Sequence, residues 1–364
     1  MITMARSAAV LAAAALALAA CGEAPAEETD PSVSEGAAGG DGGGDFQTCM
    51  VSDAGGISDK SFNETAYKGL LDAQEAGLTG EPIFAESGGD ADYVPNVESM
   101  VAEDCGLIVT VGFLLSTATS DAATANPEEK FAIVDSGPEE PIDNVKPLLF
   151  NTHEAAYLAG YLAAGVTETG VVGTWGGAKI PPVTIFMDGF ADGIAAHNEA
   201  KGTDVQLIGW DKEAQDGSFV GDFENTTVAQ QLSQTLISQQ ADIIMPVAGP
   251  LGESAASAAQ AAGNVKVIWV DNDGFEALPE YQDIILTSVL KRIDVAVQQA
   301  VQDTVDDSYS NEPFVGTLEN DGVGLAGLNA FSETVPAELQ DEVDALREQI
   351  ISGELVVESP AAIS

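Results

Sequence analysis

From residue 46 onward, short apolar segments alternate with segments of helical spacing, and this alternation limits the fold most strongly. Val- and Ile-rich segments such as 107–112 and 131–135 are typical of short buried strands, whereas 93–103 and 154–164 repeat apolar residues every three or four positions. Strands that alternate with helices form parallel sheets covered by helices. About ten strands fit two sheets better than one. We therefore expect an α/β fold of two doubly wound parallel-sheet lobes.

The order of the segments also predicts how the lobes are divided. We expect lobe 1 to comprise residues 46–152 and 288–312, and lobe 2 to comprise residues 153–287 and 313–364. The late segments then weave back between the lobes and form a hinge of several crossings. Loops at the strand ends of two such lobes face each other, which suits closure around a ligand.

The first 45 residues predict export and anchoring. Residues 1–20 resemble a signal peptide, because Arg6 gives a positive start and the Ala- and Leu-rich run is too short for a membrane span. The run ends in Leu18-Ala19-Ala20-Cys21, which resembles a bacterial lipobox, in which the cysteine is lipidated; the alternative is a plain signal peptide before an incidental cysteine. Residues 21–45 are rich in Gly, Ala and acids and predict a disordered tether. We expect an extracytoplasmic protein held at the cell membrane by lipidated Cys21 alone.

The charge balance excludes some partners. Lys and Arg total 12 against 59 Asp and Glu, which gives a formal net charge of -47. Nucleic-acid binding and adhesion to anionic lipid both need a basic face, so neither is expected. The excess indicates either a strongly solvated surface or adaptation to high salt, where self-repulsion is screened. We expect the acidic excess to be spread over the outer surface and not to line the ligand cleft.

Two cysteines of the expected globular part stand at the starts of two predicted strands. Cys49 opens the first strand, and Cys105 precedes the strand at 107–112. In a doubly wound sheet these strands are neighbours, and an exported chain meets an oxidising compartment. A disulfide between Cys49 and Cys105 is expected, and two buried free thiols are the alternative.

The loop at residues 53–63 lies between the first strand and its helix, where open α/β sheets bind ligands. It offers a carboxylate at Asp53, a hydroxyl at Ser61, an aromatic ring at Phe62 and an amide at Asn63. An aromatic face stacks on a flat heterocycle, and an amide can donate to its edge and accept from it. The alternative is that Phe62 belongs to the core and Asn63 caps the helix.

Four further candidates stand at other strand ends. Asp135 and Asp271 each end a strand, Gly249 follows the strand at 243–247, and Lys291 follows 286–290. A carboxylate accepts two hydroxyl hydrogen bonds, which suits a sugar diol, and a nearby lysine neutralises the carboxylate. Taken singly, each aspartate could be a helix cap and the lysine a solvated charge.

No motif predicts catalysis, a cofactor or a metal site. The sequence has no G-x-S-x-G, no H-E-x-x-H and no phosphate-binding G-x-x-x-x-G-K-[ST]. A G-x-G-x-x-G at 322–327 opens no βαβ unit, and we interpret it as a loop. We therefore expect no enzymatic activity.

Several segments together resemble the basic membrane protein family, which comprises substrate-binding lipoproteins of ABC transporters, including purine nucleoside receptors. The loop at 53–63 reads D-A-G-G-I-S-D-K-S-F-N and resembles the family signature. Further similar segments are 112–114, 126–135, 153–160, 184–193, 271–273 and 286–291. The resemblance covers about residues 48–330. It implies a periplasmic-binding-protein type I-like fold that captures a small molecule, most often a nucleoside, and delivers it to ABC permease subunits.

The resemblance also implies roles for individual residues. The base would lie between Phe62 and a second ring, with Ser61 and Asn63 beside it and Asp135 at its edge. The ribose would be held by Asp271 and Lys291, near the Gly249 backbone.

The second ring is expected in the segment 220–225, where Phe223 fits best and Phe219 is a rival. Asp222 and Asn225 depart from the family pattern, which puts the identity of the ligand in question. A same-fold binding protein for a sugar or signalling ligand is the alternative, and an enzyme on paired α/β lobes is a weaker one.

Overall fold

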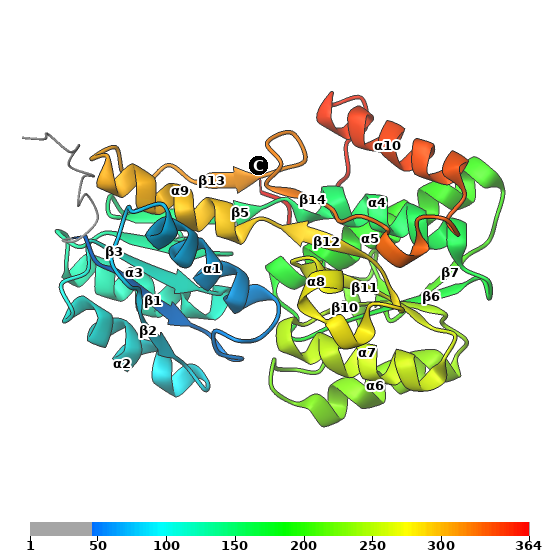
Figure 1. Cartoon of the computed structure of the whole chain (residues 1–364), viewed down its shortest axis with the longest axis horizontal. Coiled ribbons are helices and arrows are strands. Elements are labelled where there is room, and N and C mark those ends of the chain that lie inside the picture. The colour runs from blue at the N-terminus through cyan, green and yellow to red at the C-terminus, as the bar shows by residue number, and fades with distance from the viewer. Residues whose placement is uncertain (1–45, 364) are drawn as a thin grey trace, which may run out of the picture. The chain divides into compact units, whose positions relative to one another are not determined.

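The computed structural model describes residues 46–363. Two six-stranded sheets, each flanked by helices, make up this part of the chain (Figure 1). The expected α/β fold with two mainly parallel sheets is confirmed. The expected signal peptide, the tether and the lipidated Cys21 lie outside the described residues.

The first sheet is parallel throughout and has the strand order β13-β5-β4-β3-β1-β2. Its strands are β1 (Thr48–Ser52), β2 (Ile83–Glu86), β3 (Leu107–Val111), β4 (Phe131–Val134), β5 (Val145–Phe150) and β13 (Phe314–Gly316). One face is covered by α1 (Phe62–Glu75) and α9 (Ile293–Val305), and the other by α2 (Asp90–Val101) and α3 (Ser116–Ala125). We call this sheet with its four helices the first lobe.

The second sheet has the order β14-β12-β11-β10-β6-β7, and only β14 runs antiparallel to its neighbour. Its strands are β6 (Val171–Gly176), β7 (Gln206–Ile208), β10 (Ile243–Val247), β11 (Lys266–Asp271), β12 (Ile285–Lys291) and β14 (Val323–Leu325). One face is covered by α4 (Thr152–Val166) and α5 (Pro181–Lys201), and the other by α6 (Thr226–Ser238) and α7 (Gly252–Ala262). We call this sheet with its helices the second lobe.

Smaller elements complete the second lobe. The short helix α8 (Gly274–Ala277) follows β11, and α10 (Ala337–Ile351) packs on α4. The segment between β7 and α6 forms a two-stranded hairpin of β8 (Trp210–Asp211) and β9 (Asp216–Gly217).

The central strands are buried on both faces, as expected for parallel sheets between helix layers. All five residues of β1, β3 and β10 are buried. Alternate residues of β1 then join different cores: Met50 packs beneath α1 and α9, whereas Cys49 and Val51 pack beneath α2 and α3. The continuous apolar runs of the sequence therefore correspond to strands with helices on both sides.

Glycines allow α4 and α5 to approach closely. A Cβ atom on Gly189 would lie 2.2 Å from the carbonyl oxygen of His153, and one on Gly193 would lie 1.9 Å from that of Tyr157. Both distances are far below van der Waals contact, so larger residues would push the helices apart. Helix α5 itself begins with the Pro181-Pro182 pair and ends at Gly202 with φ 66°, which are favoured start and stop residues.

The chain passes between the lobes at three described connections. It crosses after β5 into α4, after β12 into α9, and after β13 into β14. The crossings differ slightly from the expected lobe limits, because β12 keeps residues 288–291 in the second sheet. Likewise β13 adds residues 314–316 to the first sheet, where hydrogen bonding to β5 holds them.

The C-terminal segment returns to the first of these crossings. Ser359 donates to buried Asp188 of α5 with a distance of 2.6 Å. The backbone N–H of Ile363 donates to the side chain of Asn151, between β5 and α4, at 3.1 Å. The end of the described chain is therefore fixed at the hinge.

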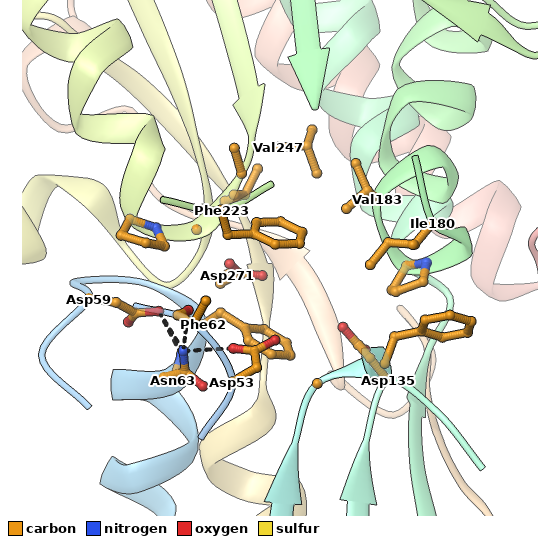
Figure 2. Close-up of a pocket in the computed structure, with 18 of the residues that line it drawn as sticks. Asp53, Asp59, Phe62, Asn63, Asp135, Ile180, Val183, Phe223, Val247 and Asp271 are labelled. Carbon is orange, nitrogen blue, oxygen red and sulfur yellow. Dashed lines mark hydrogen bonds between the residues drawn. The ribbon is translucent and has the colours of Figure 1, made fainter. Parts of the chain in front are cut away.

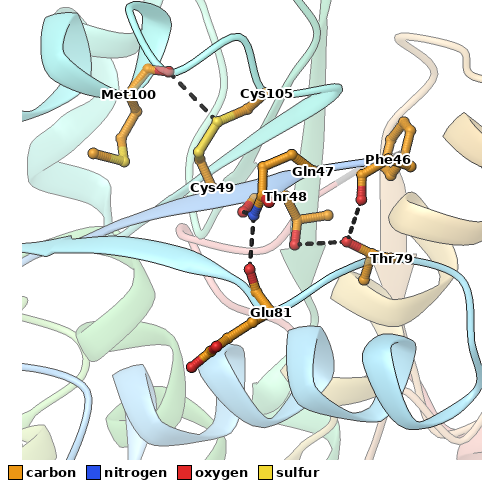
Figure 3. The surroundings of a disulfide bond; sticks show 8 residues. All are labelled: Phe46, Gln47, Thr48, Cys49, Thr79, Glu81, Met100 and Cys105. Atoms are coloured by element: carbon orange, nitrogen blue, oxygen red, sulfur yellow. Dashed lines mark hydrogen bonds between the residues drawn. A yellow bond between two sulfur atoms is a disulfide. The ribbon is translucent and has the colours of Figure 1, made fainter. Parts of the chain in front are cut away.

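A disulfide joins Cys49 and Cys105, whose Cα atoms are 5.9 Å apart (Figure 3). It links β1 to the turn that precedes β3, its parallel neighbour. The Cys105 sulfur also lies 3.6 Å from the carbonyl oxygen of Met100. The bond thus fastens the amino ends of two adjacent strands, the edge opposite the loop at 53–63.

Within residues 46–363, no helix combines the length and apolar character that crossing a membrane requires.

Candidate functional site

A cavity lies where the carboxyl ends of both sheets face each other (Figure 2). The first lobe contributes Asp53, Ala54, Asp59, Phe62, Asn63, Gly112, Phe113 and Asp135. The second lobe contributes Ile180, Pro182, Val183, Phe186, Phe223, Val247, Ala248, Gly249, Pro250, Val270, Asp271 and Lys291. The candidate residues from the sequence are thus brought together, except that Ser61 lies just behind the lining. Figure 2 shows side chains from both lobes pointing into the same space.

Asp59 organises the loop between β1 and α1. Its carboxylate accepts hydrogen bonds from the backbone N–H groups of Ser61, Asn63 and Glu64, at 3.0, 2.9 and 3.0 Å. These are free donors at the start of α1, and a carboxylate there is also stabilised by the helix dipole. Asp59 therefore caps the helix, a role that sequence reasoning did not assign to it.

Asn63 is buried and turned toward carboxylates instead of capping the helix. Its amide nitrogen lies 3.0 Å from Asp53 Oδ1, 3.3 Å from Asp59 Oδ2 and 3.3 Å from the carbonyl oxygen of Ala54. Its own Oδ1 is buried without a hydrogen-bond partner among residues 46–363. Asn63 therefore holds Asp53 in position at the cavity wall.

Two phenylalanine rings from different lobes lie on opposite sides of the cavity. Phe62 begins α1, and Phe223 comes from the loop before α6 (Figure 2). The rival residue Phe219 instead packs edge-on against Trp210, with ring centroids 5.9 Å apart, and is absent from the cavity lining. The geometry therefore places Phe223 where a second stacking ring would be needed.

Lys291 and Asp135 form a buried ion pair between the lobes. The side chains are only 2% and 6% exposed, and they come from the ends of β12 and β4. The ammonium group also lies 4.9 Å from the centre of the Phe62 ring and 5.5 Å from that of Phe186. A buried charge in such contacts is held in one position, because any displacement leaves it desolvated and unpaired.

Asp271 makes a second polar contact between the lobes. Its Oδ2 accepts a hydrogen bond of 2.7 Å from the Ser61 hydroxyl. Both Asp271 and Asp135 have positive φ angles, 74° and 64°, a region that non-glycine residues seldom adopt. Such strain at a strand end is typical of binding sites, where surrounding contacts hold the residue in place.

An outer contact between the lobes involves Lys60. Its ammonium group lies 3.5 Å from Glu253 and 3.2 Å from Glu280, and its carbonyl oxygen accepts from Asn272 at 3.1 Å. We call these three interactions the outer latch. Together with the two buried contacts, they show that the lobes are closed on each other in this structure.

Acidic side chains line the cavity, and among them Asp59 is the one that the sequence analysis did not place there. Four aspartates line it, at positions 53, 59, 135 and 271, so the expectation that acidic side chains avoid the cleft is wrong. Burial raises the pKa of Asp53 to about 8 and that of Asp59 to about 6. Burial also raises the pKa of Asp135 and Asp271, and in both cases Lys291 opposes the shift. Asp53, Asp135 and Asp271 lie at strand ends, whose carboxylates project into the space between the sheets, and Asp59 comes from the loop before α1.

Sequence reasoning missed the apolar part of the lining. Ile180, Pro182 and Val183 surround the first turn of α5, and Val247 ends β10. The Pro181-Pro182 pair signals a helix start, but no signal in the sequence tells which side of that turn faces the other lobe. Phe113, in the G-F pair after β3, was part of a recognised motif without an assigned role.

Comparison with known proteins decides the family. The sequence model of the Bmp family, described as PnrA-like ABC transporter substrate-binding proteins, matches residues 46–360. The chain belongs to this family. The resemblance seen in the sequence is thereby confirmed.

Individual relatives agree with the assignment. The chain is 30% identical to the ABC transporter nucleoside-binding protein BmpA of Lactococcus lactis, over 86% of this chain and 90% of that protein. It is 29% identical to a CD4+ T-cell-stimulating antigen of Listeria monocytogenes, over 86% and 88%. It is also 30% identical to an uncharacterized lipoprotein of Pyrococcus horikoshii, over 80% and 72%.

A solved structure of a similar chain supports the same conclusion. An ABC transporter solute-binding protein from Aeropyrum pernix K1 has a TM-score of 0.77 at 26% identity, covering 86% of this chain and 94% of that one. A solute-binding protein from Conexibacter woesei, at 21% identity and a TM-score of 0.65, shares the fold. This Bmp family member is therefore a substrate-binding protein of the ABC transporter type.

Proposed function

We propose that this Bmp family protein captures a nucleoside, with a purine as the preferred base, between its two lobes and delivers it to an ABC permease. The observation that supports it most is the pair of rings, Phe62 and Phe223, facing each other from different lobes. A purine is flat and stacks on such faces, and each base–aromatic contact contributes about 1–3 kcal/mol. The naming of the Lactococcus lactis relative as nucleoside-binding points the same way.

The polar residues suit the two halves of a nucleoside. In this proposal Asp135 and Asn63 face the base edge, while Asp271 and Lys291 bind the ribose hydroxyls near Gly249. A carboxylate accepts from a diol and an ammonium donates to its oxygens. Ser61 contributes indirectly, because its hydroxyl holds Asp271.

Isothermal titration against adenosine, guanosine, inosine, uridine, adenine and ribose tests the proposal. We expect tight binding of at least one purine nucleoside, with the free base and ribose binding more weakly. Preferential binding of a sugar, with no response to any nucleoside, would contradict it. Chromatography of the same mixtures after long incubation should show unchanged nucleoside, since the proposed role includes no turnover.

The same proposal includes an extracytoplasmic location with Cys21 as a lipid anchor. Relatives in Pyrococcus are described as lipoproteins, and the present sequence has Leu18-Ala19-Ala20-Cys21 before the tether. Mass spectrometry of the protein from its host should find a diacylglyceryl group on an N-terminal Cys21. A Cys21→Ala variant should leave the membrane fraction while its purified form still binds nucleoside.

A further inference from the structure

The cavity contains more buried acid than its positive charge can neutralise. Among the residues described, its lining holds four carboxyl groups and a single ammonium group, that of Lys291. Lys291 is committed to Asp135 by a buried ion pair. In a closed, desolvated space, the remaining negative charges must be stabilised by hydrogen bonds or removed by protonation.

Two of the remaining aspartates accept hydrogen bonds that stabilise their carboxylate form. Asp59 accepts from three backbone N–H groups. Burial raises the pKa of Asp271, and the charge of Lys291 and the hydrogen bond from the Ser61 hydroxyl oppose this rise. Hydrogen bonds to the charged form lower the pKa of such carboxyl groups and so oppose the effect of burial.

Asp53 has a much poorer environment for a negative charge. Its Oδ1 accepts a hydrogen bond from the Asn63 amide at 3.0 Å, and within residues 46–363 no donor reaches its Oδ2. That oxygen lies against Gly112, where a Cβ atom would come within 2.2 Å of it. The side chain is on the cavity lining although the residue is only 8% exposed.

The charged groups around Asp53 add to the imbalance. The negative carboxylates of Asp59 and Asp135 disfavour a further negative charge, and Lys291 opposes them less strongly. Tyr93, from α2, stays a neutral phenol, because burial raises its pKa and the nearby charge of Asp53 raises it further. Among residues 46–363, no group on the elements packed around Asp53 therefore compensates a charge on Oδ2 fully.

We propose that Asp53 takes up one proton from solvent when the lobes close on the ligand, and that its Oδ2–H then donates a hydrogen bond to an acceptor atom of that ligand. A purine ring nitrogen is such an acceptor. This proposal rests on the nucleoside-binding function above, and it adds that binding is coupled to the uptake of one proton. Asp53 thereby selects ligands that present an acceptor at this point of the cavity.

The direction of the pH effect follows from linkage. In the open form Asp53 is hydrated and titrates near the ordinary value of an aspartate, whereas burial in the closed form raises its pKa to about 8. The closed, ligand-bound form then binds more protons than the open form, so affinity falls as pH rises between these two values. The loss approaches about tenfold per pH unit and levels off above pH ~8.

Calorimetry with adenosine as the probe tests this, because its base does not titrate in this range. Titrations at pH 7 in phosphate and in Tris, whose ionisation enthalpies differ, count the protons taken up. We expect nearly one proton per adenosine bound, and an affinity more than about tenfold weaker at pH 8.5 than at pH 6.5. Asp53→Asn keeps a donor at the same place without a titrating group. It should bind adenosine at pH 7, take up no proton through residue 53, and lose most of the pH dependence.

Two control variants separate a proton donor from a merely structural residue. Asp90→Asn removes the same charge from an exposed position on the first lobe and should keep the wild-type pH profile. Asp53→Ala, which offers no donor, should bind more weakly than Asp53→Asn at pH 7.

The outcomes distinguish the two proposals. Adenosine binding without proton uptake, or an unchanged pH profile in Asp53→Asn, would overturn the role of Asp53 and leave the nucleoside function intact. Failure of adenosine and every other nucleoside to bind would overturn the nucleoside function, and the proton proposal with it.

Discussion

The two walls of the cavity differ in chemistry. The first-lobe wall carries three of the four aspartates, at positions 53, 59 and 135, together with the Asn63 amide. The second-lobe wall consists mainly of apolar groups, including Ile180, Val183, Val247 and Val270, and its polar groups are confined to Asp271 and Lys291. Each wall also presents an aromatic ring. The difference indicates that the first lobe recognises polar atoms of the ligand and the second mainly covers it.

This division has a physical reason in the local structure. The first-lobe wall is built from a loop and strand ends whose polar groups are already hydrogen-bonded to each other, as in the Asp53–Asn63–Asp59 cluster. A preformed polar wall binds without costly rearrangement. Apolar contacts are not directional, so the second-lobe wall needs no exact alignment with the ligand. Its closure removes water from the cavity and strengthens the polar contacts of the first-lobe wall.

Lys291 gives the largest expected effect, because it is the cation that the second wall supplies to the acidic first wall. Lys291→Met should lower the free energy of unfolding by about 3–5 kcal/mol, since Asp135 stays buried without a partner. Urea denaturation measures this. The double variant Lys291→Met/Asp135→Leu should recover much of the loss, and Lys179→Met, at an exposed site, should change little. A double variant as unstable as the single one would show that packing, not charge, dominates.

Asp271 tests whether the second wall contributes polar recognition of its own. Asp271→Ala should weaken nucleoside binding by about 1.5–3 kcal/mol, because the ribose loses an ionised acceptor. The free base should bind almost as before, since it lacks the hydroxyl groups. Titration with nucleoside, base and ribose provides the comparison. Equal losses for base and nucleoside would mean that Asp271 does not serve the sugar.

Phe62 and Phe223 test the aromatic stacking to which both walls contribute. Phe62→Ala and Phe223→Ala should each weaken the binding of nucleoside by about 1–3 kcal/mol, and the free base should be affected as well. Phe219→Ala is the matched control, because that ring packs on Trp210 away from the cavity. A large effect of Phe219 with none of Phe223 would reverse the assignment of the second ring.

Loss of the outer latch should have the smallest effect on the affinity for the ligand. Lys60→Ala removes ion pairs to Glu253 and Glu280 that are partly exposed. Such pairs contribute little, so we expect the affinity to fall less than about fivefold. The difference in affinity between the wild type and Lys60→Ala should shrink in high salt, which screens exposed charges. Titrations at low and high ionic strength measure it, with Glu253→Gln as a partial counterpart. A loss that persists in high salt would show that the Lys60 side chain acts by packing and not through its charge.

The sequence was sufficient for the polar part of the site because strand ends are easily read from it. Asp135, Asp271 and Lys291 each end a short apolar run, and parallel strands bring their carboxyl ends to one edge. The loop at 53–63 follows the same rule. The disposition of Ser61 behind Asp271 could not be read, because it depends on contact between the lobes.

The apolar wall needed information that the sequence does not contain. Whether Ile180 and Val183 face the cavity depends on the rotation of α5, which is fixed by its glycine-mediated packing on α4. Phe223 fitted the expected segment better than Phe219, but the reason Phe219 turns away is its bridge to Gly176, a contact that the sequence does not reveal. The helix cap at Asp59 had a local signal, an acid just before the start of α1, but its effect on cavity charge depends on burial.

The docking of the C-terminal segment at Asn151 has a practical consequence for sensor design. A reporter fused after Ile363 would sit at the pivot, where opening of the lobes displaces it least. A pair of dyes at exposed Glu86 and half-buried Glu253, on different lobes, would instead follow the opening directly. The C-terminus is thus suited to immobilisation on a surface, and these two positions to optical readout.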